Sequence, residues 1–206
     1  MIALRRSLAD HLAACAVLHT RLCPKQVLGV RMARLACMHL DIDPDITRKQ
    51  IFVFMECGRC AADAVTIVTG ASPTNQLMQL MTYGKLAATF VNLQTGAALR
   101  VREHPQSRQH AVQLMSHLPT WEAQREAYQV IPDDQLFEWE WVKLLTPIPS
   151  IPDKHCVYCE VCRDRINEHC EVTIFSQVLC KACAYGAYYQ PIQVETPALL
   201  AIHPAY

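Results

Sequence analysis

The sequence lacks an excess of charge of either sign. Its 206 residues include 19 lysines and arginines and 19 aspartates and glutamates, which gives a formal net charge of zero at pH 7. Proteins that bind nucleic acid usually carry a basic excess or a basic stripe, because they neutralise phosphate groups. The sequence shows neither feature and therefore argues against nucleic acid as a partner.

Long uninterrupted apolar runs are also missing. Apolar residues make up 51% of the chain, which is enough for a sizeable core. Charged residues, prolines or polar side chains interrupt each apolar stretch well before the roughly 20 residues that a membrane helix needs. The N-terminal segment carries Arg5, Arg6, Asp10 and His11, which do not fit a secretory signal. These absences predict a cytoplasmic protein without a membrane segment.

Cysteine, by contrast, is abundant, and its positions indicate a metal site. Six of the 11 cysteines fall within residues 156–183. Two pairs stand out, Cys159-x2-Cys162 and Cys180-x2-Cys183, because a CxxC turn places two thiolates on one side of a metal ion. Two such turns complete a tetrahedral site, which leaves no open position for a substrate. The sequence therefore predicts a structural zinc ion bound by these four cysteines.

The region around these pairs leaves other ligand sets open. Cys156-x2-Cys159 is also a CxxC pair, and His155, His169 and Cys170 lie close by in the sequence. A second metal ion or a different choice of the first pair is therefore an alternative, and a cluster of free thiols is another. A module of this size cannot fold on apolar burial alone, so a metal ion would supply much of its folding free energy.

Local signals divide the rest of the chain into helices and strands. Helical spacing begins at Ser7, where Asp10 completes a pattern that resembles a capping box, and again at Pro24, which suits a first helical turn. Gly70 suits the end of a third helix, and the Thr95–Gly96 dipeptide predicts a hairpin turn. The expected helical segments are 7–18, 24–39, 61–68 and 107–128, and the expected strands are 51–55, 86–93, 97–103 and 137–145.

This order of elements predicts an α+β fold. We expect a main domain over residues 1–145, in which helices pack on a mixed or antiparallel sheet. The proline-rich segment TPIPSIPD then predicts an extended linker over 146–153. A small zinc-ribbon module is expected over 154–190. An apolar tail over 191–206 is expected to pack on another surface, such as that of a second copy of the chain.

Three short segments of the main domain carry reactive side chains. They are 19–24 (HTRLCP), 56–64 (ECGRCAADA) and 83–85 (YGK). Histidine, cysteine and lysine side chains from separate segments can converge on one pocket, although nothing in their spacing shows that these do. The alternative, from the residues alone, is a core histidine, buried thiols and a surface lysine.

Taken in order, the segments resemble the FmdE family, a family associated with formylmethanofuran dehydrogenase. Members typically show His-Gly-His-x-Cys-Pro-Gly, Leu-Gly-x-Arg-x-Ala, Glu-x3-Cys-x2-Asp-Ala, Thr-Gly-Cys-Thr and Tyr-Gly-Lys, and many end in a zinc ribbon. The matching residues here are His19, Cys23, Pro24, Leu28, Gly29, Arg31, Ala33, Glu56, Cys60, Asp63, Ala64, Thr69, Gly70, Tyr83, Gly84 and Lys85. The hairpin and the cysteine module follow in the family's order, so the resemblance spans most of the chain.

The sequence also departs from the family's pattern. The family's second histidine falls on Arg21, the glycine after the proline on Lys25, and the cysteine after Thr-Gly on Ala71. Two candidate metal ligands are therefore lost, as is a glycine that would let the backbone approach a ligand closely. The pattern has no counterpart of Cys57, which here forms a new CxxC pair with Cys60.

The resemblance implies a site in the main domain. Its candidate residues are Cys23, Cys60 and Lys85 for catalysis, Asp63, Arg21 and Tyr83 for ligand binding, and His19, Cys23 and Cys60 for a second metal ion. Thiolates and imidazole suit zinc or iron. An arginine in place of the family's histidine would instead favour a carboxylate or phosphate ligand.

The function expected from the resemblance is that of a metal-binding FmdE-like protein. Its role would be accessory or enzyme-like, in one-carbon metabolism of the formylmethanofuran type or in molybdopterin-linked metabolism. The alternative is a non-catalytic zinc-ribbon scaffold or interaction protein with a partly eroded pocket. The resemblance and the apolar tail together also predict a homodimer.

Overall fold

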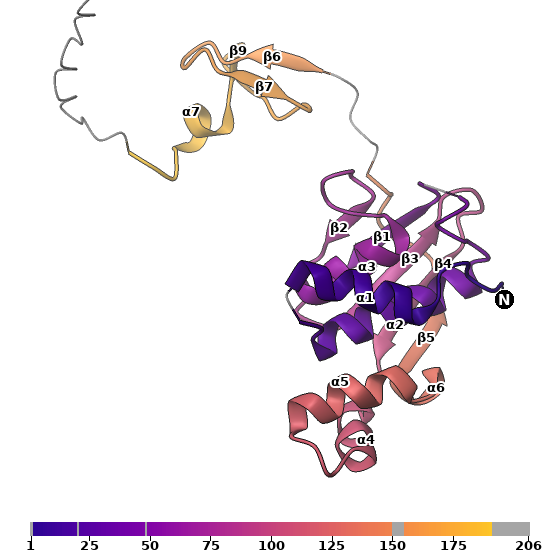
Figure 1. Cartoon of the computed structure of the whole chain (residues 1–206). Helices are drawn as coiled ribbons and strands as arrows, with labels where there is room; N and C mark the ends of the chain where they lie inside the picture. The colour runs from indigo at the N-terminus through magenta and orange to yellow at the C-terminus, as the bar shows by residue number, and fades with distance from the viewer. Residues whose placement is uncertain (1, 20, 48, 150–154, 191–206) are drawn as a thin grey trace, which may run out of the picture. The chain divides into compact units, whose positions relative to one another are not determined.

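The chain folds into two compact units, Met1–Ile148 and Pro149–Tyr206, in the computed structural model (Figure 1). The structure describes residues 2–19, 21–47, 49–149 and 155–190. The predicted apolar tail and the second half of the predicted linker lie outside these ranges. None of the helices described is long and apolar enough to cross a membrane.

A five-stranded sheet forms the centre of the first unit. Its strand order is β2-β1-β3-β4-β5, with β1 and β2 parallel and the other neighbours antiparallel. The strands are β1 (Ile51–Met55), β2 (Met78–Leu80), β3 (Ala87–Asn92), β4 (Ala98–Glu103) and β5 (Phe137–Trp141). The sheet is therefore mixed, and together with its helices it confirms the predicted α+β class.

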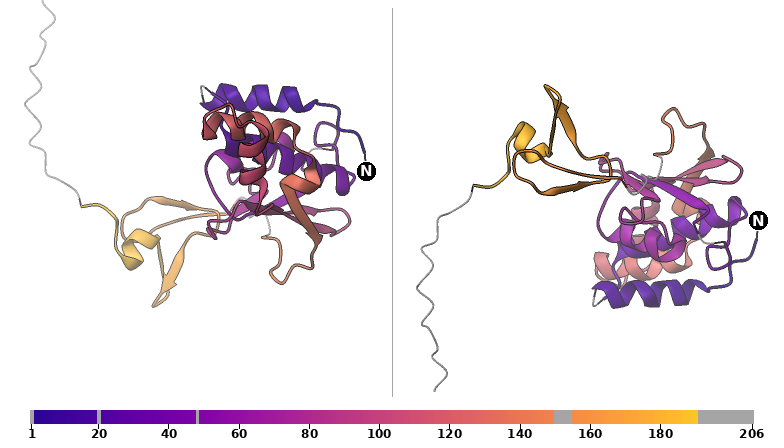
Figure 2. Two further views of the ribbon diagram at one scale, coloured as in Figure 1. Left: turned by 90° about the horizontal axis from the view of Figure 1, so that it is seen from below. Right: turned by 90° about the horizontal axis from the view of Figure 1, so that it is seen from above.

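Three N-terminal helices cover one face of this sheet (Figures 1 and 2). They are α1 (Leu8–His19), α2 (Pro24–His39) and α3 (Cys60–Thr69). Three further helices connect β4 to β5, namely α4 (Ser107–Leu114), α5 (Thr120–Val130) and α6 (Asp133–Leu136). Helix α2 is central to the unit, because it packs against α1, α3, α5 and β4.

Local interactions explain where these helices begin and end. Before α1, Asp10 N donates to Ser7 Oγ at 3.1 Å and Ser7 N donates to Asp10 Oδ2 at 3.0 Å, which is a reciprocal cap. Pro24 occupies the first turn of α2, where a missing N–H removes no helical hydrogen bond. Gly70 ends α3 in the left-handed region, with a φ of 72°.

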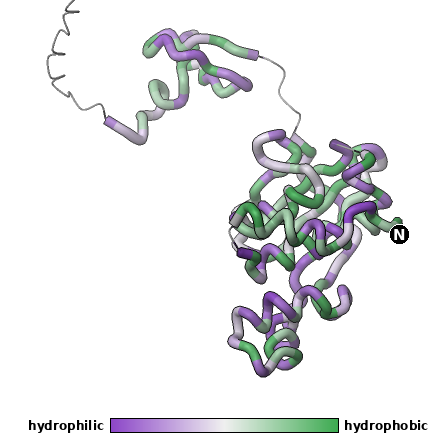
Figure 3. Tube along the Cα trace, in the orientation of Figure 1, coloured by the Kyte–Doolittle hydropathy of each residue, from purple (hydrophilic) through white to green (hydrophobic). Residues whose placement is uncertain are grey.

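The main core lies between the sheet and the helices. Ile51, Val53 and Met55 of β1 belong to this core, whereas Phe52 and Phe54 belong to a smaller apolar cluster on the other face of the sheet. Both faces of β1 are thus covered, which explains why this strand is an uninterrupted apolar run. Figure 3 shows hydrophobic residues gathered in the sheet and α1–α3, with more hydrophilic residues in α4 and α5.

Some elements differ from the sequence-based expectation. The polar helical region 107–128 contains two helices, and Pro119 immediately precedes the second one. The strand expected over 137–145 ends at Trp141. The edge strand β2 has no counterpart among the expected strands, and it pairs with β1 through Met78–Leu80.

The second unit consists of two short hairpins and a helix. Strand β6 (Cys156–Tyr158) pairs with β7 (Arg165–Asn167), and β8 (Val172–Ile174) pairs with β9 (Gln177–Leu179). Helix α7 (Lys181–Tyr185) follows. Among the described residues of this unit, the buried apolar side chains are Cys159, Ile166 and Leu179. A core of this size is too small to hold a fold, so the unit needs another source of stability.

Candidate functional site

The four cysteines predicted as zinc ligands meet in one cluster. The sulfurs of Cys159, Cys162, Cys180 and Cys183 all lie within 4.8 Å of one another, and Cys156 lies outside the group. The Cys162 and Cys180 sulfurs are 3.8 Å apart. Zinc–sulfur bonds of about 2.3 Å place two ligands of a tetrahedral ion about 3.8 Å apart, whereas a disulfide bond brings two sulfurs to about 2 Å. The observed separation therefore fits a shared metal ion.

Two turns position these sulfurs. In the first, Cys159 N donates to the Asp164 carbonyl oxygen at 2.9 Å, and Arg163 takes a left-handed φ of 66°. In the second, Cys180 caps α7, and Cys183 N donates to the Cys180 sulfur at 3.4 Å. Backbone N–H groups that donate to sulfur favour its thiolate form, which is the form that binds metal.

A double hydrogen bond joins the two turns. Glu160 N donates to the Val178 carbonyl oxygen at 2.9 Å, and Val178 N donates to Glu160 Oε1 at 2.9 Å. Glu160 lies within the first CxxC pair, and Val178 belongs to β9, which leads directly into the second pair. The two pairs are therefore held together by one backbone hydrogen bond and one bond to the Glu160 side chain, as well as by any ion between them.

Two of the four thiols, those of Cys159 and Cys183, differ in acidity. Backbone N–H groups of Cys162 and Cys180 lower the pKa of Cys159 to about 6. The neighbouring Cys180 side chain and burial raise the pKa of Cys183 to about 12. Four thiolates repel one another, so all four can ionise together when a cation balances their charge. The donor set is thus chemically suited to a divalent ion with a preference for sulfur.

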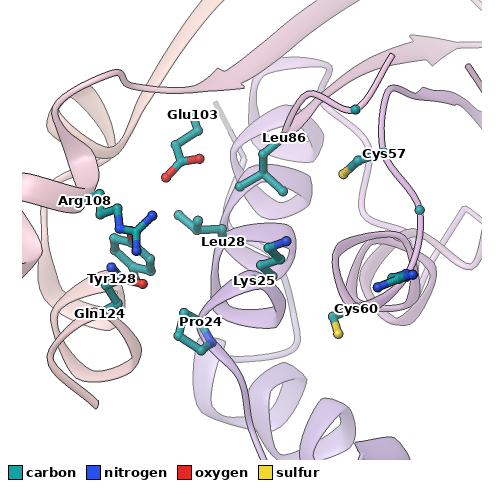
Figure 4. Close-up of a pocket in the computed structure, with 13 residues that line it drawn as sticks. Pro24, Lys25, Leu28, Cys57, Cys60, Leu86, Glu103, Arg108, Gln124 and Tyr128 are labelled. Atoms are coloured by element: carbon teal, nitrogen blue, oxygen red, sulfur yellow. The ribbon is translucent and has the colours of Figure 1, made fainter. Parts of the chain in front are cut away.

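The first unit contains a cavity of about 420 Å³ (Figure 4). In this view Cys57 and Cys60 lie on one side of the cavity, Glu103 and Arg108 lie on the opposite side, and Lys25 lies between them. The lining comes from the N-terminal parts of α2 and α3, from the loops before α3 and before β3, from the end of β4, and from α4 and α5. Segments far apart in the sequence therefore build one hollow.

Among the charged side chains that line this cavity, cations outnumber anions. Lys25, Arg59 and Arg108 border it, together with a single carboxylate among the lining residues, that of Glu103. The cavity also lies beside the first residues of α2 and α3, where unpaired backbone N–H groups carry partial positive charge. Both features favour an anionic group in the cavity.

Polar side chains from three elements form the wall opposite the cysteines. Ser107 Oγ donates to Glu103 Oε1 at 2.8 Å, and the Tyr128 hydroxyl is also a hydrogen-bond partner of Ser107. Burial and the Glu103 carboxylate raise the pKa of Tyr128 to about 12, so this hydroxyl stays protonated at neutral pH. Gln124 Nε2 is buried and has no hydrogen-bond partner among the described residues. The wall therefore includes a donor that a ligand can use.

Three of the predicted site residues lie close together beside this cavity. The Cys60 thiol is a hydrogen-bonding neighbour of Cys23, whose pKa burial raises. Burial, followed by the charges of Cys23 and Asp63, raises the pKa of Cys15 to about 11, which places Cys15 of α1 near the same group. The packing of α1, α2 and α3 thus brings Cys23 and Asp63 near a buried thiol that the sequence analysis did not select, and Cys60 beside Cys23.

The other predicted residues lie elsewhere. The Arg21 guanidinium lies over the Trp121 ring, 4.8 Å from its centroid. Tyr83 lines a separate hollow on the other face of the sheet. Lys85 is exposed and is not among the residues that line the cavity. The side chain of His19 lies outside the described part of the structure.

Sequence reasoning missed the wall that faces the cysteines. Glu103, Arg108 and Tyr128 come from a segment that the sequence marks as a strand followed by a polar helical region. No motif distinguishes them. The sequence did hold one signal, since a tyrosine in an otherwise polar amphipathic helix is a candidate for burial. In the structure Tyr128 is 2% exposed.

Comparisons with known proteins agree with this architecture. The family model described as "FmdE, Molybdenum formylmethanofuran dehydrogenase operon" matches residues 18–156. A solved structure of a tungsten formylmethanofuran dehydrogenase FmdE-like protein from Syntrophus aciditrophicus has a TM-score of 0.64 and 20% identity. The match covers 92% of this chain and 100% of that chain. At this identity the structural likeness shows the fold alone.

A curated relative from Archaeoglobus fulgidus is named probable S-adenosyl-L-methionine-binding protein. It is 26% identical over 194 residues, which cover 83% of this chain and 51% of the relative. The chain thus spans about half the length of that relative. The family model, by contrast, matches most of this chain, including Cys23, Cys60 and the residues that line the cavity of the first unit. The chain therefore belongs to the FmdE family.

Proposed function

We propose that this FmdE-family protein binds a structural zinc ion in its second unit and a small anionic ligand in the cavity of its first unit. Its role would be accessory or enzyme-like, in one-carbon metabolism of the formylmethanofuran type or in molybdopterin-linked metabolism, as the family's description suggests. The observation that carries the proposal is the four-thiol cluster, because its sulfurs are spaced as ligands of one tetrahedral ion.

The ion in the second unit has a structural role. Four thiolates around one ion leave no open position for a substrate, which is the arrangement of structural zinc sites. The unit has few buried apolar residues among those described, so the free energy of metal binding would replace the missing core. Zinc suits this site because it favours four-coordinate tetrahedral geometry with sulfur ligands.

The ligand in the first unit would carry a carboxylate or a phosphate. Lys25, Arg59 and Arg108 outnumber the carboxylate of Glu103 in the cavity lining. Lys25 stands where the family pattern has a glycine, so this chain adds a cation at the start of α2. S-adenosylmethionine, which the name of the A. fulgidus relative mentions, carries a carboxylate together with an ammonium and a sulfonium group. It is therefore a probe for recognition of the carboxylate, and pyrophosphate is the probe for a net negative charge.

A second metal ion in the first unit is part of the proposal. The thiols of Cys23 and Cys60 are neighbours and would supply two ligands, and His19 is proposed as a third. In an enzyme-like role, the proposed reactive groups are Cys23, Cys60 and Lys85, and the proposed ligand-binding residues are Asp63, Arg21 and Tyr83. The buried Ala71, which replaces a cysteine of the family pattern, belongs to the core and supplies no ligand.

Metal analysis of the purified full chain tests both ions. Elemental mass spectrometry should show that Cys180→Ser loses the zinc equivalent of the second unit. It should also show that Cys60→Ser loses a different equivalent and keeps that zinc. If Cys60→Ser holds as much metal as the wild type, the first unit binds no metal through these thiols. That result would favour the alternative, a non-catalytic zinc-ribbon scaffold.

Calorimetric titration with pyrophosphate and with S-adenosylmethionine tests the cavity. At least one probe should bind, and Arg108→Gln should weaken that binding by about tenfold, as expected for the loss of one charge-assisted contact of about 1.4 kcal/mol. Arg165→Gln, an exposed arginine of the second unit, is the control and should bind normally. Binding that is equal in both variants would contradict a cationic binding site at Arg108.

We also propose that the chain forms a homodimer, as the resemblance implies. Light scattering of the full chain at micromolar concentration should give about twice the mass of one chain. A monomer under these conditions would contradict it. A cytoplasmic location likewise stays a prediction.

A further inference from the structure

Two histidines and a glutamate form a second cluster in the second unit, separate from the four cysteines. The ligand atoms of His155, His169 and Glu171 all lie within 4.8 Å of one another. His155 Nε2 is 3.0 Å from Glu171 Oε1, and His169 Nδ1 is 3.9 Å from Glu171 Oε1. The two imidazole rings are parallel to within 3°, with centroids 4.1 Å apart. Both rings therefore present a nitrogen to one carboxylate.

The β6–β7 hairpin and the turn after it place these three residues. His155 precedes β6, and its carbonyl oxygen accepts a hydrogen bond from Glu168 N at 3.1 Å. Glu168 and His169 both take left-handed φ values, 58° and 54°, so the chain reverses after β7. This reversal stacks the His169 ring on the His155 ring, and Glu171 follows directly before β8.

One carboxylate oxygen of the cluster is left unpaired. Glu171 Oε2 is shielded from solvent and has no hydrogen-bond partner among the described residues. A shielded carboxylate oxygen without a partner costs free energy. An ion pair with a protonated histidine accounts for Oε1 and leaves Oε2 unsatisfied. A cation that contacts Oε2 as well as Oε1 would supply the missing partner.

The separations fit a metal ion better than a pair of protonated histidines. Two stacked imidazolium rings would repel each other, and neutral rings offer the lone pairs that bind metals. Bonds of about 2.0–2.1 Å place two ligands of a tetrahedral zinc ion about 3.3 Å apart. The two nitrogen–oxygen separations, 3.0 and 3.9 Å, lie on either side of this value. The longer one exceeds the length of a hydrogen bond.

We propose that His155, His169 and Glu171 bind a divalent transition-metal ion in addition to the ion of the four cysteines. Imidazole and carboxylate ligands suit zinc and its neighbours cobalt, nickel and copper, whereas magnesium and calcium prefer oxygen ligands. Three protein ligands leave a fourth position for water or another small ligand. The second unit thus has one closed metal site and one open site, and the open site does not depend on the proposed cavity function.

The two sites of this unit lie at opposite ends of one strand. His155 directly precedes β6, and Cys159 directly follows it. Four residues of extended chain span about 13 Å at about 3.3 Å per residue, so the two ions share no ligand. Each ion would fix one end of the β6–β7 hairpin, which accounts for the stability of a unit with so small a core.

Cobalt titration of the metal-free full chain tests this site. Thiolate ligands give cobalt an intense charge-transfer absorption, whereas imidazole and carboxylate ligands give it weak visible bands alone. The wild type should bind one cobalt equivalent with weak bands in addition to the thiolate site. His169→Ala and Glu171→Gln should each lose that equivalent and keep the thiolate absorption. His117→Ala, an exposed histidine of the first unit, is the control and should bind as the wild type does.

Equal cobalt uptake by the wild type, His169→Ala and Glu171→Gln would overturn the proposal. Glu171→Gln keeps the shape of the side chain, so it separates metal binding from folding. Retention of the thiolate absorption in this variant shows that the hairpins remain folded. A metal equivalent that Cys60→Ser loses belongs to the first unit. The proposed metal site of the first unit is therefore tested by Cys60→Ser, and the His155–His169–Glu171 site is tested by His169→Ala and Glu171→Gln.

Discussion

Gly29 of α2 lies directly against Ala61 of α3. A Cβ atom added at Gly29 would lie 2.7 Å from the Ala61 carbonyl oxygen and 2.9 Å from the Ala64 Cβ atom. Because a close-packed interior leaves no room for such an approach, the two helices can adopt this spacing with glycine at position 29 and not with a larger residue. The contact sets the distance between the two helix N-termini that border the cavity and bring Cys23 and Cys60 together.

Replacement of Gly29 by alanine should lower the free energy of unfolding by about 1–3 kcal/mol, because the helices must separate. The effect should appear although alanine favours a helix over glycine by about 1 kcal/mol. Urea denaturation followed by circular dichroism measures it. Gly58→Ala is the control, since a Cβ atom there meets nothing within 4 Å. Equal stability of the two variants would contradict the close approach.

Glu56, one of the residues that resembles the family pattern, forms a two-pronged ion pair with Arg100. Arg100 Nε donates to Glu56 Oε1 at 2.7 Å, and another guanidinium nitrogen donates to Oε2 at 3.0 Å. The Glu56 side chain is 8% exposed and that of Arg100 is 22% exposed. Glu56 therefore links the end of β1 to β4 across the intervening β3. This structural role explains why glutamate stands at this position of the family pattern.

Glu56→Gln should lower the free energy of unfolding by about 2–4 kcal/mol, because it leaves a partly buried arginine with the more exposed Glu140 carboxylate, 3.6 Å away, as its remaining counter-charge. Thermal and urea unfolding of the full chain measure the loss. The matched control is Glu138→Gln, because this side chain and its partner Arg102 are both more exposed than Glu56 and Arg100. An exposed pair contributes at most about 1 kcal/mol, so a similar loss in both variants would refute the special role of Glu56.

Features encoded by neighbouring residues could be predicted from the sequence. The Ser7–Asp10 cap, the proline at the start of α2 and the left-handed Gly70 are each decided within a few residues. The four-thiol cluster was also predictable, because each CxxC pair forms its own turn and the hairpins between them are short. The separate edge strand β2 was not, since its three residues carry no alternation and their pairing with β1 depends on distant packing.

The cavity was predictable in part. The order of short motifs pointed to Cys23, Cys60 and Asp63, and the structure brings these residues together. Tyr83 and Lys85 belong to one tripeptide, but the first lines a hollow on the other face of the sheet and the second is exposed. A short motif fixes sequence spacing and does not fix the direction of each side chain. That direction depends on the whole packed unit.

Cys180→Ser should release the zinc ion and unfold the second unit, because the unit's described apolar core is too small to persist without metal. The first unit, with its own extensive core, should stay folded. Amide hydrogen exchange of the full chain can follow both units at once. Protection should fall across 155–190 and stay unchanged across the strands of the first unit.

Cys170→Ser is the control for this prediction, because Cys170 lies outside the four-thiol group. This variant should keep both its zinc and its protection from exchange. Full zinc content in Cys180→Ser would show that the four-cysteine assignment is wrong.

A buried histidine gives the first unit a dependence on pH. His11 is 3% exposed, and an Arg34 guanidinium nitrogen lies 3.0 Å from His11 Nδ1. Burial, followed by the charge of Arg34, lowers the pKa of His11 from 6.5 to about 4. The neutral ring can accept a hydrogen bond from Arg34, which also donates to the Arg6 carbonyl oxygen at 2.6 Å. Protonation of His11 would place a second positive charge beside this guanidinium.

The sign of the effect follows from the direction of the shift. Because the pKa of His11 is lower in the folded protein than in the unfolded chain, protons bind preferentially to the unfolded chain as pH falls. The stabilising contribution of neutral His11 is therefore complete above about pH 6.5 and is lost as pH falls toward about 4.

Between pH 7 and pH 4 the wild type should lose about 2–3 kcal/mol more unfolding free energy than His11→Asn. Asparagine keeps a polar acceptor near the Nδ1 position and does not titrate. Urea denaturation at both pH values measures the difference, and His117→Asn, an exposed histidine, should behave as the wild type does. If His11→Asn and the wild type lose equal stability on acidification, His11 is not the group that senses pH.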